Sequence, residues 1–337
     1  MNIWQSISLK PYNTFGIDAP AECFTILTDE TQIGEIADEK NRFKRKKTLG
    51  GGSNILLTKA VDGLVIKNEL KGITVAEEND THVWLEVKAG EVWHELVMFS
   101  IQQNLGGLEN LSLIPGCVGA APMQNIGAYG VEVKDRIDEV VAWHWQANEF
   151  ISLKNSDCRF GYRDSIFKHE LKDKVIITSV TFKLDKIHCP NTSYGAIQQQ
   201  LELMGASTPD IKSVSDAVIA IRSSKLPDPK KIGNAGSFFK NPTIDRVHFE
   251  KLKEHYPGIP SYPANYDMIK VPAGWLIEHT GWKGYKDGEV GVHEKQALVL
   301  VNFGAAKGND IWQLSEKIVK SVKDRFEIEL EREVNVW

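Results

Sequence analysis

The chain has 337 residues, enough for two or three domains with hydrophobic cores of their own. Its hydrophobic fraction of 42% and charged fraction of 25% are those of an ordinary globular protein, and its net charge of −5 gives no general attraction to nucleic acid or acidic membranes. No apolar run approaches the roughly 20 residues of a membrane span, and the N-terminus does not resemble a signal peptide. We therefore expect a cytoplasmic protein without nucleic-acid or membrane partners.

The cysteines and histidines predict neither disulfides nor a metal site. Cys23, Cys117, Cys158 and Cys189 are far apart and form no Cys-x-x-Cys pair. The nine histidines do not have the spacing of a metal-binding motif such as His-Glu-x-x-His. We expect four reduced thiols, most of them buried, and no metal.

The hydrophobic pattern predicts strands and helices mixed along the chain. Val83, Leu85 and Val87 alternate with Trp84 and Glu86, which indicates a strand, and a helix is predicted over 91–104. Residues 137–185 are rich in strand patterns.

In the second half of the chain, Ser213 is predicted to begin a helix, with Asp216 completing a capping box. The remaining pattern predicts a helix over 273–280, a buried strand over 297–302, a helix over 310–326 and an alternating strand over 328–337.

Two glycine-rich segments are candidates for ligand binding. In Thr48–Asn54, three glycines precede Ser53 and Asn54, and such a concave backbone can bind phosphate, although a plain turn is an equal alternative. The segment is not Gly-x-Gly-x-x-Gly, so a Rossmann site is disfavoured. Residues 105–130 contain six glycines and little periodicity, but they are too apolar to be disordered. They could lie against a large flat ligand, or the glycines could serve packing.

The segment 225–242 has the composition of an anionic substrate site with a proton carrier. It contains Ser237 after two glycines, surrounded by cationic and amide donors, namely Lys225, Lys240 and Asn241. The alternative is a surface loop in which the serine only forms a turn. Arg163, between Tyr162 and Asp164, is either a buried charge held by partners or a surface arginine.

Several motifs together resemble the UDP-N-acetylenolpyruvoylglucosamine reductase (MurB) family, the flavoenzymes of peptidoglycan synthesis. The resemblance extends over essentially the whole chain, and the motifs occur in the family's order: Thr48–Asn54, Ile114–Gly119, Gln124–Gly130, Phe160–Ser165, Lys225–Pro229, Gly233–Pro242 and Leu330–Val334. Each motif is weak alone, but their common order is specific. Tyr194 in its Ser-Tyr-Gly loop resembles the longer-loop branch, which folds a tyrosine-bearing loop over the substrate.

The resemblance implies an α+β fold. It has a FAD-binding domain of the vanillyl-alcohol-oxidase (PCMH) type in two lobes, plus a separate α+β substrate-binding domain. The expected boundaries are 1–65 for the first lobe, 66–225 for the second lobe with 327–337 returning to it, and 226–326 for the substrate-binding domain.

The resemblance also implies the reaction. NADPH reduces non-covalently bound FAD, which then passes a hydride to the enolpyruvyl group of UDP-N-acetyl-3-O-(1-carboxyvinyl)-glucosamine. The product is UDP-N-acetylmuramate, which serves cell-wall biogenesis and so cell shape and division. The expected partners are the UDP-sugar and NADPH, and the expected state is a monomer.

By the same resemblance, Ser237 is the proton donor, while Arg163 and Glu333 polarise the substrate carboxylate. Glu333 can do so only if protonated, so we expect burial to raise its pKa. Glu331 is a rival carboxylate on the same side of a strand. Asn335 stands where the family often has arginine, which leaves the support of Glu333 to be explained.

The remaining site residues also follow from the resemblance. The positions that match substrate contacts are Tyr129, Tyr194, Lys225, Asn241, Tyr262, Lys270 and Gln296. Those that match the flavin-binding loops are Gly50, Gly51, Gly52, Ser53, Asn54, Gly116, Gly119 and Gly127.

Two alternatives remain open. One is a flavin- or UDP-sugar-binding protein that lacks catalysis, against which the presence of Ser237, Arg163 and Glu333 argues. The other is a different flavin oxidase of the same fold with covalent FAD, for which Cys117 near the flavin loops would be the residue to test.

Overall fold

The computed structural model describes residues 1–39, 43–264 and 266–337, which divide into two compact units. Unit 1 consists of 1–7, 21–51 and 62–224. Unit 2 consists of 8–20, 52–61 and 225–337. No helix in these described ranges is long and apolar enough to cross a membrane.

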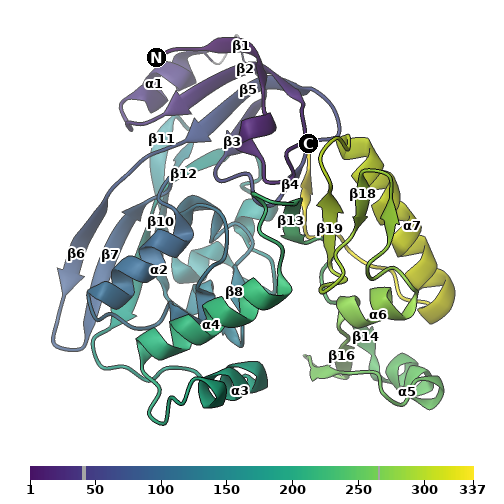
Figure 1. Ribbon diagram of the computed structural model, residues 1–337. Helices are drawn as coiled ribbons and strands as arrows, with labels where there is room; N and C mark the ends of the chain where they lie inside the picture. The colour runs from purple at the N-terminus through teal and green to yellow at the C-terminus, as the bar shows by residue number, and fades with distance from the viewer. Residues whose placement is uncertain (40–42, 265) are drawn as a thin grey trace. The chain divides into compact units, whose positions relative to one another are not determined.

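The larger sheet of unit 1 is built from strands with one apolar face. Within the described residues it has the order β11-β10-β12-β7-β6, with β6 at Ile73–Glu78, β7 at His82–Lys88, β10 at Ile137–His144, β11 at Glu149–Lys154 and β12 at Val175–Asp185. Val83, Leu85 and Val87 of β7 are buried, which confirms the predicted alternation. Helix α2 (Trp93–Gln102) covers one face (Figure 1), where Trp93 meets Phe182 edge to face.

A second sheet of unit 1 has the strand order β1-β2-β5-β3. Its strands are β1 (Trp4–Ser8), β2 (Pro20–Leu27), β3 (Lys46–Leu49) and β5 (Val61–Asn68), and α1 (Gln32–Asp38) contributes Ile33 and Ile36 to its core. Strand β3 runs parallel to β5. It ends at Leu49, so the three glycines at positions 50–52 follow it directly.

Residues 105–130 are irregular, as predicted. They contain the short 3-10 helices η3 (Glu109–Leu111) and η4 (Val118–Ala120) and begin the small strand pair of β8 (Gly127–Ala128) and β9 (Val131–Glu132). Leu105, Leu108, Leu111 and Val118 are nevertheless in the main core of unit 1. Apolar side chains therefore anchor an irregular backbone.

Unit 1 ends with α3 (Gly195–Leu203) and α4 (Ile211–Lys225), which share a small apolar core with Tyr129. Helix α4 begins before Ser213, and the expected pairing of Ser213 with Asp216 is wrong. The Asp210 carboxylate accepts from the Ser213 N–H at 2.7 Å, while the Ser213 hydroxyl accepts from the Asp210 N–H at 2.8 Å. Asp216 instead pairs with Lys212. The Asp210 carboxylate, just before the helix, thus accepts from one of the N–H groups of the first turn, which have no partner within the helix.

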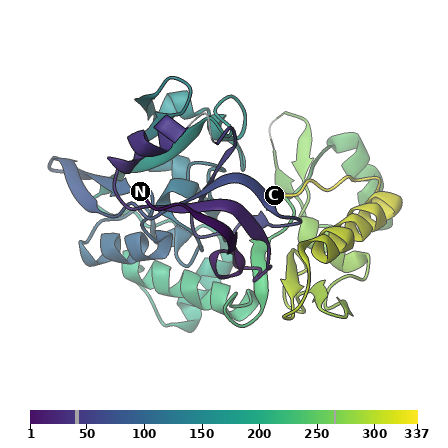
Figure 2. The same ribbon diagram turned by 90° about the horizontal axis from the view of Figure 1, so that it is seen from above.

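The main sheet of unit 2 has the order β13-β19-β18-β17 in the described residues, with β13 at Gly233–Ser237, β17 at Lys286–Asp287, β18 at Val290–Val292 and β19 at Val299–Asn302. The longest helix, α7 (Gly308–Phe326), buries Ile311, Leu314, Ile318 and Val322 as predicted. Figure 2 shows the chain leaving α7 and running back to the C-terminus as an extended segment.

The other elements of unit 2 are short. They are β4 (Ile55–Leu56), β14 (Thr243–Asp245), α5 (Arg246–His255), β15 (Tyr262–Pro263), β16 (Met268–Lys270), α6 (Ala273–His279) and β20 (Asn335–Val336). The predicted closing strand over 328–337 is regular only at β20, which pairs with β4, and at a bridge from Arg332 to Phe239.

Candidate active site

Ser237 ends strand β13, directly after a glycine with a left-handed backbone. Gly236 has φ +69°, a conformation that side chains disfavour, and a Cβ on Gly233 would lie 2.3 Å from the Phe15 carbonyl oxygen. Ser237 is partly exposed, whereas Phe238 and Phe239 after it are buried. The two buried rings therefore fix the strand, while Ser237 remains partly exposed.

Glu333 lies beside this strand because the chain end pairs with it. The Phe238 N–H donates to the Leu298 carbonyl at 2.8 Å, and the Phe238 carbonyl accepts from the Glu333 N–H at 2.9 Å. Lys240 continues the ladder, since its N–H donates to the Glu331 carbonyl at 2.9 Å. Unit 2 therefore brings the backbones of Ser237 and Glu333 together, although 96 positions separate them in the sequence (333 minus 237).

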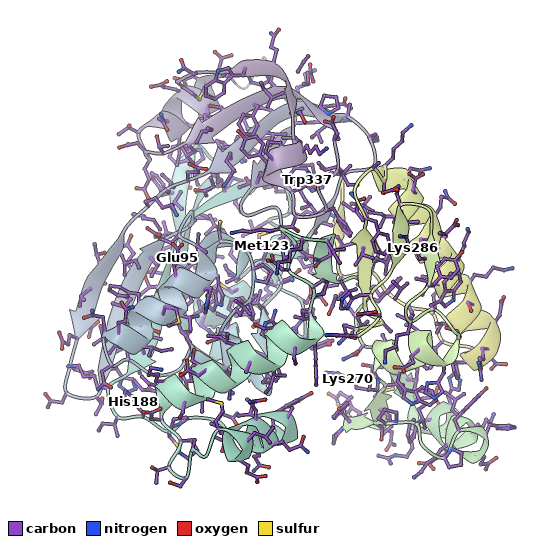
Figure 3. All side chains as sticks on the ribbon, in the orientation of Figure 1. Glu95, Met123, His188, Lys270, Lys286 and Trp337 are labelled. Carbon is purple, nitrogen blue, oxygen red and sulfur yellow. The ribbon has the colours of Figure 1, made fainter. Side chains whose placement is uncertain are left out.

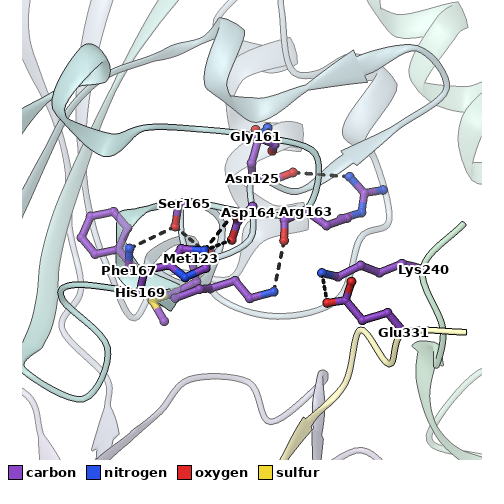
Figure 4. Close-up of polar contacts among 11 residues, drawn as sticks. Met123, Asn125, Gly161, Arg163, Asp164, Ser165, Phe167, His169, Lys240 and Glu331 are labelled. Carbon is purple, nitrogen blue, oxygen red and sulfur yellow. Dashed lines mark hydrogen bonds and ion pairs between the residues drawn. The ribbon is translucent and has the colours of Figure 1, made fainter. Parts of the chain in front are cut away.

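Glu331, the rival carboxylate, is committed to an ion pair at the surface. Its side chain is 70% exposed and contacts the Lys240 ammonium (Figure 4). Glu333 is partly buried. The pairing favours Glu333 as the functional carboxylate, because the exposed Glu331 carboxylate already has Lys240 as its cationic partner.

The backbone of Glu333 is held from two sides. Its N–H is bonded to Phe238 as above, and its carbonyl accepts from the Asn54 Nδ2 at 3.3 Å. Asn335 supports the same contact, since its backbone N–H and its Nδ2 both donate to the Asn54 carbonyl at 3.1 Å. Asn335 thus bonds the end of the chain to the loop that carries Asn54.

The other substrate-site candidates of unit 2 gather around a small sheet and the start of α6. Strand β16 ends at Lys270 (Figure 3), which is paired with Thr243 on one side and Tyr262 on the other. The Asn241 Oδ1 accepts from the Ala273 N–H at 2.9 Å, and a Cβ on Gly274 would lie 3.3 Å from the Gln296 Oε1. Lys225 is exposed at the end of α4.

In unit 1, Arg163 lies in a tight turn closed by two backbone bonds between Gly161 and Asp164, at 3.0 and 3.3 Å. Its φ is +53°, and the Lys168 ammonium donates to its carbonyl at 3.1 Å. Its guanidinium donates to the carbonyl oxygens of Asn125, at 3.4 Å, and Gly127. Of the two alternatives left open by the sequence, the structure supports a partly buried charge held by partners (Figure 4).

Unit 1 also brings Tyr129 and Tyr194 together and adds Arg222, which the sequence motifs did not contain. The two tyrosine rings meet edge to face at 5.4 Å. The Arg222 guanidinium bonds the Tyr129 phenol, and its Nε donates to the Leu113 carbonyl at 3.3 Å. Burial raises the pKa of Tyr129, against the opposing effect of Arg222. Arg222 lies in the last turn of α4, and no local sequence pattern indicates that its partner is Tyr129, 93 positions away (222 minus 129).

The glycines of the flavin-type loops are required for close backbone packing. A Cβ on Gly51 would lie 2.9 Å from the Gly116 Cα, and a Cβ on Gly119 would lie 2.6 Å from the Ala89 Cβ. In unit 2, Gly52 has φ +63° and its Cβ would lie 2.0 Å from the Tyr12 carbonyl oxygen. In unit 1 the loops of Gly51 and Gly116 thus meet backbone to backbone. Glycine-rich loops of this kind can suit a phosphate-bearing cofactor.

Cys117 does not have the character of a reactive thiol. It is buried, with its Cβ 3.5 Å from where a Cβ on Gly50 would lie, and burial raises its pKa. This disfavours covalent flavin attachment through Cys117. All four cysteines are free, and three are buried, as predicted. No group of three or more His, Cys, Asp or Glu suited to a metal occurs in the part of the chain that the structure describes.

Comparison with known proteins gives consistent matches over the whole chain. Residues 228–337 match the C-terminal domain of UDP-N-acetylenolpyruvoylglucosamine reductase, and residues 21–144 match a FAD binding domain. The chain is 50% identical to the reductase of that name from Flavobacterium johnsoniae over the full length of both, and 49% identical to the one from Chromobacterium violaceum over 97% of this chain and 96% of the relative. The crystal structure of the Thermus caldophilus reductase (MurB) superposes with a TM-score of 0.70 at 25% identity, covering 100% of this chain and 99% of that one.

Proposed function

The chain belongs to the UDP-N-acetylenolpyruvoylglucosamine reductase family, and we propose that it catalyses the family reaction with Ser237 as proton donor. The membership confirms the α+β fold with a FAD-binding domain of the vanillyl-alcohol-oxidase type and a separate substrate-binding domain. It is a FAD-dependent oxidoreductase of peptidoglycan synthesis.

When bound, FAD would supply the hydride transfer from NADPH to the enolpyruvyl group, chemistry that side chains lack. The residues that would hold FAD are the glycines at positions 50, 51, 52, 116, 119 and 127, together with Ser53 and Asn54. The close approach of Gly51 to Gly116, of Gly52 to Tyr12 and of Gly119 to Ala89 supports this assignment, and the buried Cys117 supports non-covalent binding.

Ser237 supplies the proton in this proposal. When hydride reaches the terminal enolpyruvyl carbon, negative charge develops on the carbon that bears the carboxylate, and that carbon must be protonated. An aliphatic hydroxyl is a very weak acid in water, so it serves only a strongly basic centre in a preorganised site. The partial exposure of Ser237, which follows the left-handed Gly236 and precedes two buried phenylalanines, supports this role.

Arg163 and Glu333 stabilise the developing enolate. The permanently charged guanidinium pairs with the substrate carboxylate. Glu333 acts in its protonated form, because an ionised carboxylate would repel that of the substrate. The partly buried position of Glu333, with Glu331 ion-paired to Lys240 instead, supports the choice between the two carboxylates.

The UDP-sugar is bound by the remaining candidates. Lys225 and Lys270 suit the diphosphate, while Asn241 and Gln296 offer amide contacts. Tyr129, Tyr194 and Tyr262 supply rings and hydroxyls. Tyr129 packs on the core shared by α3 and α4 and also contacts the Tyr194 ring, which supports a defined position for the loop that carries Tyr194. We further propose that the protein works as a cytoplasmic monomer.

One observation carries the proposal: the Phe238 carbonyl, next to Ser237, accepts the Glu333 N–H, so two distant motifs of the family share one ladder. The test is to incubate the purified protein with NADPH and the enolpyruvyl sugar and to identify the product. We expect a sugar nucleotide that has gained two hydrogens and carries a lactyl methyl group. An unchanged sugar beside oxidised NADPH would overturn the substrate assignment.

A further inference from the structure

Asn125 is a fully buried polar residue that none of the roles above uses. It is 0% exposed in unit 1 and has φ +45°, a left-handed conformation that asparagine tolerates better than most residues. A buried amide must find partners for two N–H donors and for its oxygen. All of these are satisfied by protein groups.

The Asn125 side chain joins three separate stretches of chain. Its Nδ2 donates to the Gly161 carbonyl at 2.8 Å and to the Glu132 carboxylate at 3.1 Å. Its Oδ1 accepts from the Lys134 N–H at 3.1 Å. Gly161 is the first residue of the turn that carries Arg163, so this amide bonds directly to that turn.

The backbone of the same loop receives the Arg163 side chain. The carbonyl oxygens of Asn125 and Gly127 accept from the two terminal nitrogens of the guanidinium (Figure 4 shows the contact to Asn125). A Cβ on Gly127 would lie 3.0 Å from the Arg163 Nη1 and 2.8 Å from the Val131 carbonyl oxygen. The missing side chain of Gly127 therefore makes room for Arg163.

We propose that Asn125 is a positioning residue for Arg163. The loop Asn125–Gly127 holds the guanidinium in the orientation in which it pairs with the substrate carboxylate. The side-chain amide of Asn125 bonds the turn that carries Arg163, at Gly161, and the backbone carbonyl of Asn125 accepts from the Arg163 guanidinium. One residue thus contacts both the backbone turn and the side chain that it carries. The inference rests on the proposed function, because it assumes that Arg163 pairs with that carboxylate.

The variant that tests this is Asn125→Asp, which keeps the size and the acceptor for the Lys134 N–H but removes both donors. It also sets a carboxylate against Glu132 and the Gly161 carbonyl, an arrangement only partly offset by Lys134, which pairs with Glu132 at 2.8 Å. Asn125→Gly is the second variant, because it tolerates the left-handed backbone and removes the amide without adding charge. One of the two should retain the fold.

Asn68→Asp is the matched control. Asn68 is also buried in unit 1, and its Nδ2 donates to the Ile177 carbonyl at 2.9 Å while its Oδ1 accepts from the Leu70 N–H at 3.2 Å. It has no bond to the Arg163 turn among the described contacts. A general loss of stability would appear in both variants.

The first readout is the rate at which the enolpyruvyl sugar reoxidises the pre-reduced enzyme. We expect Asn125→Asp and Asn125→Gly to lower this rate about 10- to 100-fold while flavin reduction by NADPH stays within about twofold of wild type. In an Arg163→Met background the same Asn125 changes should lower it by less than about twofold, because coupled residues are not additive. Equal losses in both half-reactions, or full additivity with Arg163→Met, would overturn the proposal.

The second readout is binding to the oxidised enzyme. The Asn125 variants should lose affinity for UDP-N-acetylmuramate, which carries the carboxylate, and keep affinity for UDP-N-acetylglucosamine, which lacks it. Equal loss for both ligands would assign Asn125 a structural role only. If wild type itself is not reoxidised by the enolpyruvyl sugar, the proposed function fails, which is a different result from an unaffected Asn125 variant in an active enzyme.

Discussion

Arg163 in unit 1 and the Ser237–Glu333 pair in unit 2 are held in place by different means. Arg163 lies in a left-handed turn fixed by side chains, with Asn125 bonded to Gly161 and Lys168 bonded to the Arg163 carbonyl. The Ser237 and Glu333 segments are held by a backbone ladder through Phe238. A ladder does not depend on the identity of its side chains, whereas a turn fixed by side chains does.

This difference predicts where substitutions have indirect effects. Around Arg163, changing a residue that never touches the substrate should alter catalysis, because side-chain hydrogen bonds from Asn125 and Lys168 help to hold the turn that carries the guanidinium. In the Ser237–Glu333 ladder, replacing an exposed neighbour that does not touch the substrate should have little effect on catalysis, because backbone hydrogen bonds join the two segments.

The largest expected effect is that of Ser237→Ala. Reoxidation of the reduced enzyme by the enolpyruvyl sugar should slow about 10²- to 10⁴-fold, because no other group is assigned to protonate the developing carbanion. Flavin reduction by NADPH should be unchanged, and stopped-flow absorbance separates the two half-reactions. A loss of both half-reactions to the same extent would remove Ser237 from its role.

Glu333→Ala and Glu331→Ala form a matched pair on the same segment. Glu333→Ala should slow reoxidation about 10²-fold through loss of enolate stabilisation. Glu331→Ala should change it by less than about twofold, because this carboxylate is 70% exposed, is paired with Lys240 and has no assigned role in the reaction. If the Glu331 variant were the slower one, the carboxylate assignment would be reversed.

A smaller effect is expected for Arg222→Met in unit 1, where side-chain contacts hold the candidate site residues. Loss of its bond to the Tyr129 phenol should raise the KM for the UDP-sugar about tenfold and leave the reaction with NADPH unaffected. Tyr129→Phe should reproduce the change, since it removes the same bond. Additive effects in the double variant would show that Arg222 acts elsewhere.

The smallest expected effect concerns stability at high pH near the Arg163 turn. Burial raises the pKa of Cys158 from 9.0 to about 12, so between these values the unfolded chain loses this proton and the folded chain keeps it. The free energy of unfolding should therefore fall as pH rises above about 9, by at most about 1.4 kcal/mol per pH unit. Cys158→Ala should show a smaller fall in denaturant titrations at pH 8 and pH 10, and an identical slope would refute the assignment.

The sequence predicted the elements whose burial is periodic. The alternation of Val83, Leu85 and Val87 and the inward face of α7 follow from strand and helix periods, which are local properties. The motifs also named Arg163, Ser237 and Glu333, whose roles stay predictions until tested. The start of α4 was misplaced because Asp210, not Asp216, bonds to Ser213.

The anchors of the site could not be predicted from the sequence. The bonds from Asn125 to Gly161 and from Glu333 to Phe238 join residues far apart in the chain, and hydrophobic periodicity reports burial without identifying such partners. Arg222 was missed for the same reason, since its partner Tyr129 belongs to another segment. The support that Asn335 gives through Asn54 likewise needed the structure.

The most direct test of the central claim is the visible absorption spectrum of the purified protein, followed without air. NADPH is added first and the enolpyruvyl sugar second. We expect bleaching of the flavin band by NADPH and its recovery on addition of the sugar, which would establish both half-reactions in one sample. A band that bleaches but does not recover with this sugar would contradict the proposed substrate, and the absence of a flavin band even after reconstitution with FAD would contradict the whole account.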